Sequence, residues 1–265
     1  MLIATDGAEF DVRDEGRGPA LVLIHGFPLA KEIWDAQAAA LAGSARVIRF
    51  DLRGLGSTTV TPGPYLMEQL AGDLLEILDA LRVERAVIAG HSLGGYAALA
   101  FFRMFAERCA GLALVCSRAS ADTPEAAAGR LELAARAERE GIAPIAEAFL
   151  PRFFAPDFAA SSPELVARAR AIVERTDPRG AAAMLRGMAA RVASDDLFED
   201  LTVPVAVIAG ALDPIISLDE ARATVRALPD ATLEVLECGH SPWYETPDAL
   251  SASLARLVER AASKT

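Results

Sequence analysis

Short apolar runs that end at turn residues alternate with longer segments of helical periodicity along most of this 265-residue chain. A continuous apolar run such as residues 20–24 is typical of a strand buried on both faces, whereas leucines spaced along residues 65–81 are typical of an amphipathic helix. The strand-like runs are residues 2–4, 9–12, 20–24, 46–50, 85–89, 112–115, 203–209 and 232–236. The helical patterns between them are residues 34–41, 65–81, 94–105, 218–228 and 249–262. This alternation predicts an α/β fold with a mostly parallel sheet covered by helices on both faces.

The alternation stops between residues 118 and 201. No strand-like run occurs there, and the sequence is an Ala-, Glu- and Arg-rich helical pattern interrupted by prolines. The candidate helices of this stretch are residues 125–140, 142–150, 162–175 and 179–192. We therefore predict an α/β core from residues 1–117 and 202–265, with residues 118–201 inserted as a helical cap, or lid. A separate small helical domain is the alternative.

Composition excludes several classes of partner. Asp and Glu (37) outnumber Lys and Arg (26), which gives a formal net charge of −11. Nucleic acids and anionic membranes are recognised by clustered positive charge, so neither is expected as a partner. No apolar run reaches the ~18 residues that a membrane span needs. The three cysteines lack metal-ligand spacing, which indicates buried thiols in a reducing compartment, and we expect a cytoplasmic protein.

Residues 90–95 (Gly-His-Ser-Leu-Gly-Gly) follow one predicted strand and precede a predicted helix. A serine between glycines at a strand-to-helix turn can be held in a strained conformation that exposes its hydroxyl. The pattern and its context predict Ser92 as a nucleophile. The alternative is a glycine-rich turn without chemistry.

A serine nucleophile needs a base, and the chain has only three histidines. His91 is adjacent to Ser92 and cannot easily reach its hydroxyl, while His25 closes a strand and is expected to be structural. His240 directly follows the strand at residues 232–236, where a parallel sheet presents functional groups, and it is the predicted base. A solvated loop histidine is the alternative for His240.

The base in turn needs a carboxylate to orient it. Several acids lie between Ser92 and His240, but only Asp213 directly follows a buried strand. This position favours a partly buried carboxylate beside the imidazole. The chain order Ser, Asp, His is the one associated with a nucleophile elbow. An N-cap of the helix at residues 218–228 is the alternative role for Asp213.

Tetrahedral intermediates also need donors for a developing oxyanion. The backbone N–H of Leu93, at the start of the helix after Ser92, is the first candidate. The N–H of Phe27, in the turn after the strand at residues 20–24, is the second. This turn could instead be merely structural.

Together these motifs resemble the α/β-hydrolase superfamily over essentially the whole chain. The motifs are residues 25–28 (HGFP), 51–57 (DLRGLGS), 90–95 (GHSLGG), 210–213 (GALD) and 239–242 (GHSP). Within the superfamily the chain is similar to the lid-bearing, cofactor-free branch of small esterases, enol-lactonases and haloperoxidase-like enzymes. The resemblance implies an eight-stranded, mostly parallel sheet with a cap near residues 118–201, and a triad of Ser92, Asp213 and His240. Serine at position 92 differs from the aspartate of the related haloalkane dehalogenases and epoxide hydrolases. Leu55 departs from the His, Tyr or Phe that relatives commonly carry there.

We therefore expect a serine hydrolase that cleaves a carboxylic ester or lactone through an acyl-enzyme, with neither cofactor nor metal. A substrate bearing a carboxylate would need a cation in the pocket, and the candidates Arg118, Arg130 and Arg152 are each expected at the surface. A C–C bond hydrolase, a thioesterase or a perhydrolase could use the same triad. A non-catalytic small-molecule-binding protein is the alternative from another class. The sequence leaves the oligomeric state open.

Overall fold

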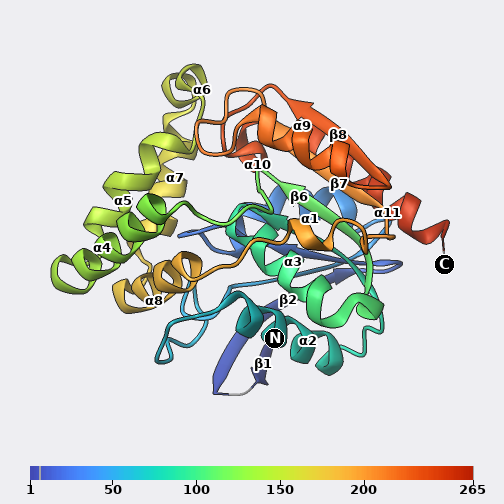
Figure 1. The fold of residues 1–265 in the computed structure, drawn as a ribbon, viewed down its shortest axis with the longest axis horizontal. Coiled ribbons are helices and arrows are strands. Elements are labelled where there is room, and N and C mark those ends of the chain that lie inside the picture. The colour runs from blue at the N-terminus through green and yellow to red at the C-terminus, as the bar shows by residue number, and fades with distance from the viewer. Residues whose placement is uncertain (6, 265) are drawn as a thin grey trace.

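The computed structural model describes residues 1–5 and 7–264, and an eight-stranded sheet lies at its centre (Figure 1). In spatial order the strands are β1 (Leu2–Thr5), β2 (Ala8–Gly16), β4 (Arg46–Phe50), β3 (Ala20–Ile24), β5 (Ala86–His91), β6 (Cys109–Val115), β7 (Val205–Gly210) and β8 (Ala231–Leu236). β2 pairs antiparallel with both β1 and β4, and all other neighbours pair parallel. The predicted α/β class and mostly parallel sheet are confirmed. The connection between the predicted strands at residues 2–4 and 9–12 includes residue 6, which lies outside the described residues.

The central strands are apolar on both faces because helices cover both sides of the sheet. In β3, Val22 and Ile24 belong to one hydrophobic cluster, whereas Leu21 and Leu23 belong to the other. The first cluster includes side chains of α2 (Met67–Ala80), α3 (Leu93–Phe105) and α9 (Leu218–Ala227). The second includes side chains of α1 (Asp35–Leu41) and α11 (Pro247–Ala262).

Five helices follow β6 and precede β7, and together they form what we term the helical insertion. They are α4 (Pro124–Glu140), α5 (Ala143–Phe149), α6 (Pro156–Ser161), α7 (Pro163–Glu174) and α8 (Pro178–Ala189). The insertion lies at the left of Figure 1, beside one edge of the sheet. A proline occupies the first turn of every one of these helices, where its missing N–H leaves no bond unmade. No helix of the described residues is both long and apolar enough to cross a membrane.

The sequence pattern missed the shortest helices. α6 has six residues and α10 (Pro242–Glu245) has four, too few for a helical period to be recognised. The other helices agree with their predicted bounds to within three residues at either end. These short elements matter because α10 begins two residues after His240.

Parallel pairing brings the ends of distant strands to one edge of the sheet. The register pairs Ile24 with Gly90, His91 with Val115, Val115 with Ile208, and Gly210 with Leu236. The loops that follow β3, β5, β6, β7 and β8 therefore share this edge. They carry Phe27, Ser92, Cys116, Asp213 and His240.

Candidate active site

Ser92 lies at the sharp turn between β5 and α3. Its backbone has φ 51° and ψ −113°, a left-handed conformation that a serine rarely adopts. Its N–H donates to the carbonyl of Val115 at 2.9 Å, and its carbonyl accepts from the Ser117 hydroxyl at 2.7 Å. Ser92 is the only residue between positions 86 and 102 that is not buried. The turn therefore presents this serine at the surface of an otherwise buried segment.

Glycines allow the strand and the helix to approach each other at this turn. A Cβ added to Gly90 would lie 2.1 Å from the backbone of Gly94. One added to Gly94 would lie 2.4 Å from the carbonyl oxygen of Ile24, at the end of β3. The glycines of the motif thus permit contacts that no side chain would allow.

Asp213 and His240 form a direct, buried contact. The Nδ1–H of His240 donates to Oδ2 of Asp213 at 2.8 Å, and both side chains are at most 2% exposed. Oδ1 of Asp213 accepts from the N–H groups of Ile215 and Ile216 at 2.7 and 3.1 Å. Burial raises the pKa of Asp213, but His240 and these two donors outweigh it and hold the pKa below its ordinary value. The carboxylate is therefore ionised, and it directs the other ring nitrogen of His240 away as a free acceptor.

The helix-capping alternative for Asp213 is wrong. The N-cap of α9 is Ser217, which forms a capping box with Glu220. The loop that carries Asp213 is instead bound to the loop that carries His240, because Leu212 N–H donates to the carbonyl of Cys238 at 2.9 Å.

Glu245 holds the backbone on both sides of His240. Its carboxylate accepts from the N–H groups of Gly239 (3.0 Å), Ser241 (3.3 Å) and Ala155 (3.0 Å). The last contact reaches the residue before α6, so Glu245 also links this loop to the helical insertion. The sequence analysis did not identify Glu245, and a glutamate after a Ser-Pro pair gives no signal of this role.

The other two histidines are fully buried, and both are hydrogen-bonded to the backbone. Nε2 of His25 accepts from Leu52 N–H, and its Nδ1–H donates to the carbonyl of Gly26, each at 2.9 Å. His91 lies beside His240, with ring centroids 4.8 Å apart, and its Nε2–H donates to the His240 carbonyl at 2.7 Å. The expectation that His25 is structural is confirmed.

The two predicted oxyanion donors lie on elements in mutual contact. Leu93 begins α3, and the start of α3 packs against the carbonyls of Ile24 and His25, just before Phe27. Within the described ranges, neither the Phe27 N–H nor the Leu93 N–H donates to a protein acceptor. Both amides therefore remain available for a ligand oxygen. Likewise, no hydrogen bond joins the Ser92 hydroxyl to another described residue.

A row of aromatic rings runs from the Phe27 turn to His240. Phe27 contacts Phe149 edge to face, with centroids 5.2 Å apart, and Phe149 lies 6.4 Å from Phe153. Phe153 stacks on the His240 ring at 6.3 Å with an interplanar angle of 21°. Phe149 and Phe153 belong to the helical insertion, so this row gives the candidate site an apolar wall.

The three arginines considered as ligands for a substrate carboxylate are placed differently from one another. Arg118 and Arg130 both bind Asp122, at 3.1 and 2.5 Å, and are half-buried. The expectation of a surface position is wrong for these two because Asp122 draws them inward. Arg152 is exposed and donates to the carbonyl of Pro214 at 3.4 Å.

Cys116 also belongs to the site, although its pattern indicated only a small buried side chain. Its Sγ, an oxygen of Asp213 and a ring nitrogen of His240 all lie within 4.8 Å of one another. This is the one cluster of metal-ligand type found among the described residues. A metal there would have to displace the bond between Asp213 and His240 and deprotonate a thiol whose pKa burial and Asp213 raise well above its ordinary value. The donor set therefore fits a protonated thiol better than a metal centre.

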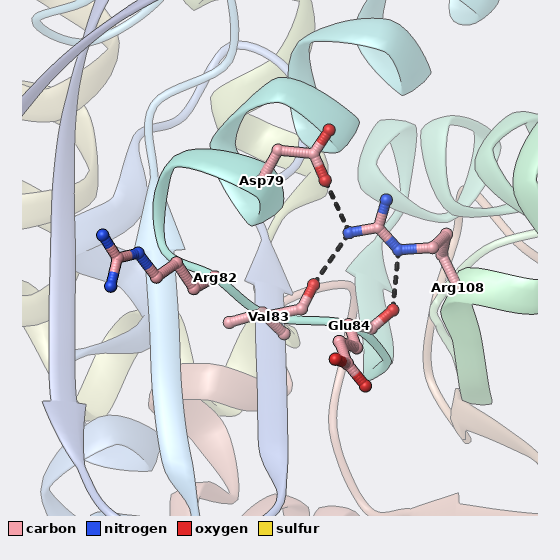
Figure 2. Close-up of a pocket in the computed structure, with 5 residues that line it drawn as sticks. All are labelled: Asp79, Arg82, Val83, Glu84 and Arg108. Atoms are coloured by element: carbon pink, nitrogen blue, oxygen red, sulfur yellow. Dashed lines mark hydrogen bonds and ion pairs between the residues drawn. The ribbon is translucent and has the colours of Figure 1, made fainter.

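Several cavities lie outside this site. One, of about 540 Å³, is at the opposite edge of the sheet, where Figure 2 shows Arg108 donating to Asp79 and to the carbonyls of Val83 and Glu84. Arg108 thus links the end of α2 to the segment just before β5 through these hydrogen bonds. Another cavity, of about 680 Å³, is lined by residues between positions 142 and 174, among them Leu150 and Phe154.

The whole chain matches known proteins. The family model described as the alpha/beta hydrolase family matches residues 21–253, and the chain belongs to this family. It is 36% identical to a thermophilic esterase from Thermogutta terrifontis whose structure has a malate bound, with a TM-score of 0.94 over 98% of this chain and 97% of that one. It is 30% identical to the enol-lactonase from Burkholderia xenovorans, with a TM-score of 0.92 over 98% of this chain and 100% of that one. It is also 28% identical to 3-oxoadipate enol-lactonase 2 of Acinetobacter baylyi, over 97% of this chain and 94% of that protein. The chain is thus an α/β-hydrolase of the esterase and enol-lactonase type.

Proposed function

We propose that the protein cleaves a carboxylic ester or lactone through an acyl-enzyme formed on Ser92. The observation that carries this proposal is the buried bond between His240 Nδ1–H and Asp213, formed at the same sheet edge as the left-handed turn at Ser92. An imidazole oriented in this way can take a proton at Nε2. The enol-lactonase and esterase relatives support the same reaction class.

In the proposed reaction the Ser92 hydroxyl attacks the carbonyl carbon while His240 accepts its proton. The N–H groups of Phe27 and Leu93 bind the oxyanion, and donors of this kind contribute several kcal/mol to transition-state stabilisation. His240 then donates the proton to the departing alkoxide. Water cleaves the acyl-enzyme in the same manner, with His240 again accepting and returning the proton.

The residues around the site favour an uncharged, apolar substrate. The aromatic row from Phe27 to Phe153 supplies an apolar wall, while Arg118 and Arg130 are occupied by Asp122. We propose that residues 118–201 act as the cap over this pocket. The three cysteines form no disulfide, which supports a reducing compartment such as the cytoplasm.

The test is turnover of short p-nitrophenyl esters by wild type and by Ser92→Ala. We expect the variant to lose at least about 10³-fold in kcat, because removing the nucleophile leaves only binding and oxyanion stabilisation. Ser263→Ala, on an exposed serine after α11, is the matched control and should retain wild-type rates. A fluorophosphonate probe should label Ser92. Wild-type protein without esterase activity, or a Ser92→Ala variant as active as wild type, would refute the proposal.

A second comparison tests the substrate class. A neutral lactone and the same lactone bearing a carboxylate should differ in kcat/KM, with the neutral compound preferred. Preference for the carboxylate would show that one of the arginines leaves Asp122 to bind substrate. A thioester, a β-diketone and peracid formation from acetate and hydrogen peroxide test the alternatives that use the same triad.

A further inference from the structure

His91 is a buried titratable side chain that the proposed reaction does not use, and the inference drawn from it rests on that proposed function. It ends β5, directly before Ser92, and is 1% exposed. Its Nε2 lies 2.7 Å from the backbone oxygen of His240. A carbonyl oxygen only accepts hydrogen bonds, so this contact fixes the ring proton on Nε2. Burial, and then the neighbouring His240, lowers the pKa of His91 to about 3, so the ring is neutral near pH 7.

The opposite edge of the His91 ring packs against the turn that carries Phe27. A Cβ added to Gly26 would lie 2.5 Å from Nδ1 and 3.0 Å from Cε1 of His91. In the part of the chain that the structure describes, Nδ1 has no hydrogen-bond partner. The ring therefore contacts Gly26 by packing alone, and it limits how closely this turn can approach Ser92.

The ring also contacts two aromatic side chains. It lies 4.8 Å from the His240 ring at an interplanar angle of 53°, and 6.1 Å from the Trp243 ring at 82°. One imidazole thus contacts the backbone and ring of the proposed base and the residue before one oxyanion donor. It is also covalently adjacent to the proposed nucleophile.

We propose that His91 is a positioning residue that sets the distances among Ser92, His240 and the Phe27 N–H, without itself transferring a proton. It acts on the base through the hydrogen bond to the His240 carbonyl, and on the oxyanion donor by packing against Gly26. A reaction of this kind is sensitive to such distances, because a misplacement of about 1 Å can cost ~10²-fold in rate. The hydrogen bond that Nε2–H donates and the packing of the Nδ1 edge against Gly26 are two distinct contacts, and they can be tested separately.

Two variants separate the hydrogen bond from the bulk. His91→Met fills a similar volume without a donor, whereas His91→Gln retains an N–H that can reach the His240 carbonyl. With a short p-nitrophenyl ester we expect His91→Met to lose about 30-fold or more in kcat, with KM changed less than about 3-fold, as loss of transition-state geometry predicts. His91→Gln should recover at least about 5-fold of this loss, because it again pairs the buried carbonyl.

Gly26→Ala tests the packing edge without removing the donor. The added Cβ must displace the His91 ring, so we expect a loss in kcat of about 10-fold or more in the wild-type background. In the His91→Met background the flexible side chain can yield, and the same substitution should cost less than about 3-fold. Equal losses in the two backgrounds would show that Gly26 and His91 act independently and would overturn this part of the role.

The pH profile distinguishes positioning from proton transfer. Because His91 is neutral over the working range, the acid limb of kcat/KM should stay in place in both His91 variants. A shifted or missing acid limb would show that His91 titrates in the reaction. Rates of His91→Met within 2-fold of wild type, or His91→Gln as slow as His91→Met at equal thermal stability, would also overturn the proposal.

A spectroscopic readout keeps this test independent of esterase activity. If wild type hydrolyses no ester, the proposed function fails, but the position of His240 can still be measured by proton NMR. The His240 Nδ1–H, which donates to Asp213, should give a resonance that shifts or broadens in His91→Met and returns toward its wild-type position in His91→Gln. An identical resonance in all three proteins would overturn the positioning role.

Discussion

Two residues of the candidate site, Ser92 and Cys116, have a positive φ, which is strained for any residue other than glycine. Of the described residues other than glycine, Arg82, Ser92 and Cys116 have positive φ, and the last two directly follow β5 and β6, neighbouring strands of the sheet. Each such conformation costs on the order of 1–3 kcal/mol and persists only where the surroundings impose it. At Cys116 the N–H donates to Ile208, which continues the pairing of β6 with β7 beyond the end of the strand. The sheet thus holds both turns in place.

The thiols provide a prediction at this scale. Burial raises the pKa of Cys109 and Cys238 to about 12, and that of Cys116 well above its ordinary value, while all three side chains are buried. The thiolate is the reactive form, so iodoacetamide at pH 8 should label none of them in the folded protein. Mass spectrometry should find all three labelled after denaturation in urea. Labelling of Cys116 in the native state would show that the site beside Asp213 opens to solvent.

The sequence predicted Asp213 and His240 because each follows a predicted strand, and parallel pairing brings such positions to one edge. It did not predict the contact between His91 and His240, or the position of Cys116 beside them. These contacts depend on the direction in which side chains leave the strand ends, and that direction comes from packing among segments more than a hundred residues apart. The order of residues along the chain does not by itself predict that direction.

At the scale of elements, α8 packs directly against the backbone of the core because the residues on its contact face are small. A Cβ on Gly180 would lie 1.9 Å from the carbonyl oxygen of Gly54, and one on Gly187 would lie 1.6 Å from that of Tyr65. Between them, the carbonyl of Ala183 accepts from the N–H of Tyr65 at 3.2 Å. These positions, three to seven residues apart, lie on one face of the helix. The helical insertion is therefore fixed to the core along α8.

Gly187→Ala should destabilise the protein because its new methyl group has no room beside the Tyr65 carbonyl. Overpacking of this kind costs about 1–3 kcal/mol, and more where backbone must move. Gly129→Ala, in the exposed middle of α4, meets nothing within 4 Å and should instead stabilise the protein by about 0.5–1 kcal/mol. Urea denaturation of the two variants measures both effects. A Gly187→Ala protein as stable as wild type would mean that α8 can move away from the core at little cost.

Asp122 joins the two ends of the helical insertion. Its carboxylate contacts Arg118 and Arg130 near the first end and Arg191, after α8, at 3.5 Å. The Arg191 guanidinium also lies 3.8 Å above the ring of Tyr96, one helical turn after Ser92. The sequence predicted this insertion from the absence of strand-like runs, but it did not predict the ion-pair cluster, because its members are separated by up to 73 positions.

At the scale of the whole molecule, buried ionisable groups make stability depend on pH in one direction. Burial lowers the pKa of His25 and His91, so these rings stay neutral to lower pH in the folded protein than in the unfolded chain. Burial raises the pKa of Asp51, Asp122 and Asp213, but their neighbours outweigh it, so these groups stay ionised to lower pH than in the unfolded chain. In all five cases the unfolded chain binds more protons in acid than the folded one. Acid therefore favours unfolding through every one of these groups.

The free energy of unfolding should consequently fall as the pH is lowered from 6.5 toward 3. Over this range the unfolded chain protonates His91, whose ordinary pKa is 6.5, while the folded chain, with a pKa of about 3, does not. One proton of difference corresponds to a loss of about 1.4 kcal/mol per pH unit, and the carboxylates add to it below about pH 4. Urea denaturation at a series of pH values measures the slope. His91→Gln, which cannot titrate, should reduce that slope between pH 6 and 4.5 by about 1.4 kcal/mol per unit. An unchanged slope in this variant would mean that His91 is protonated in the folded protein, and that its hydrogen bond to the His240 carbonyl does not require a neutral ring.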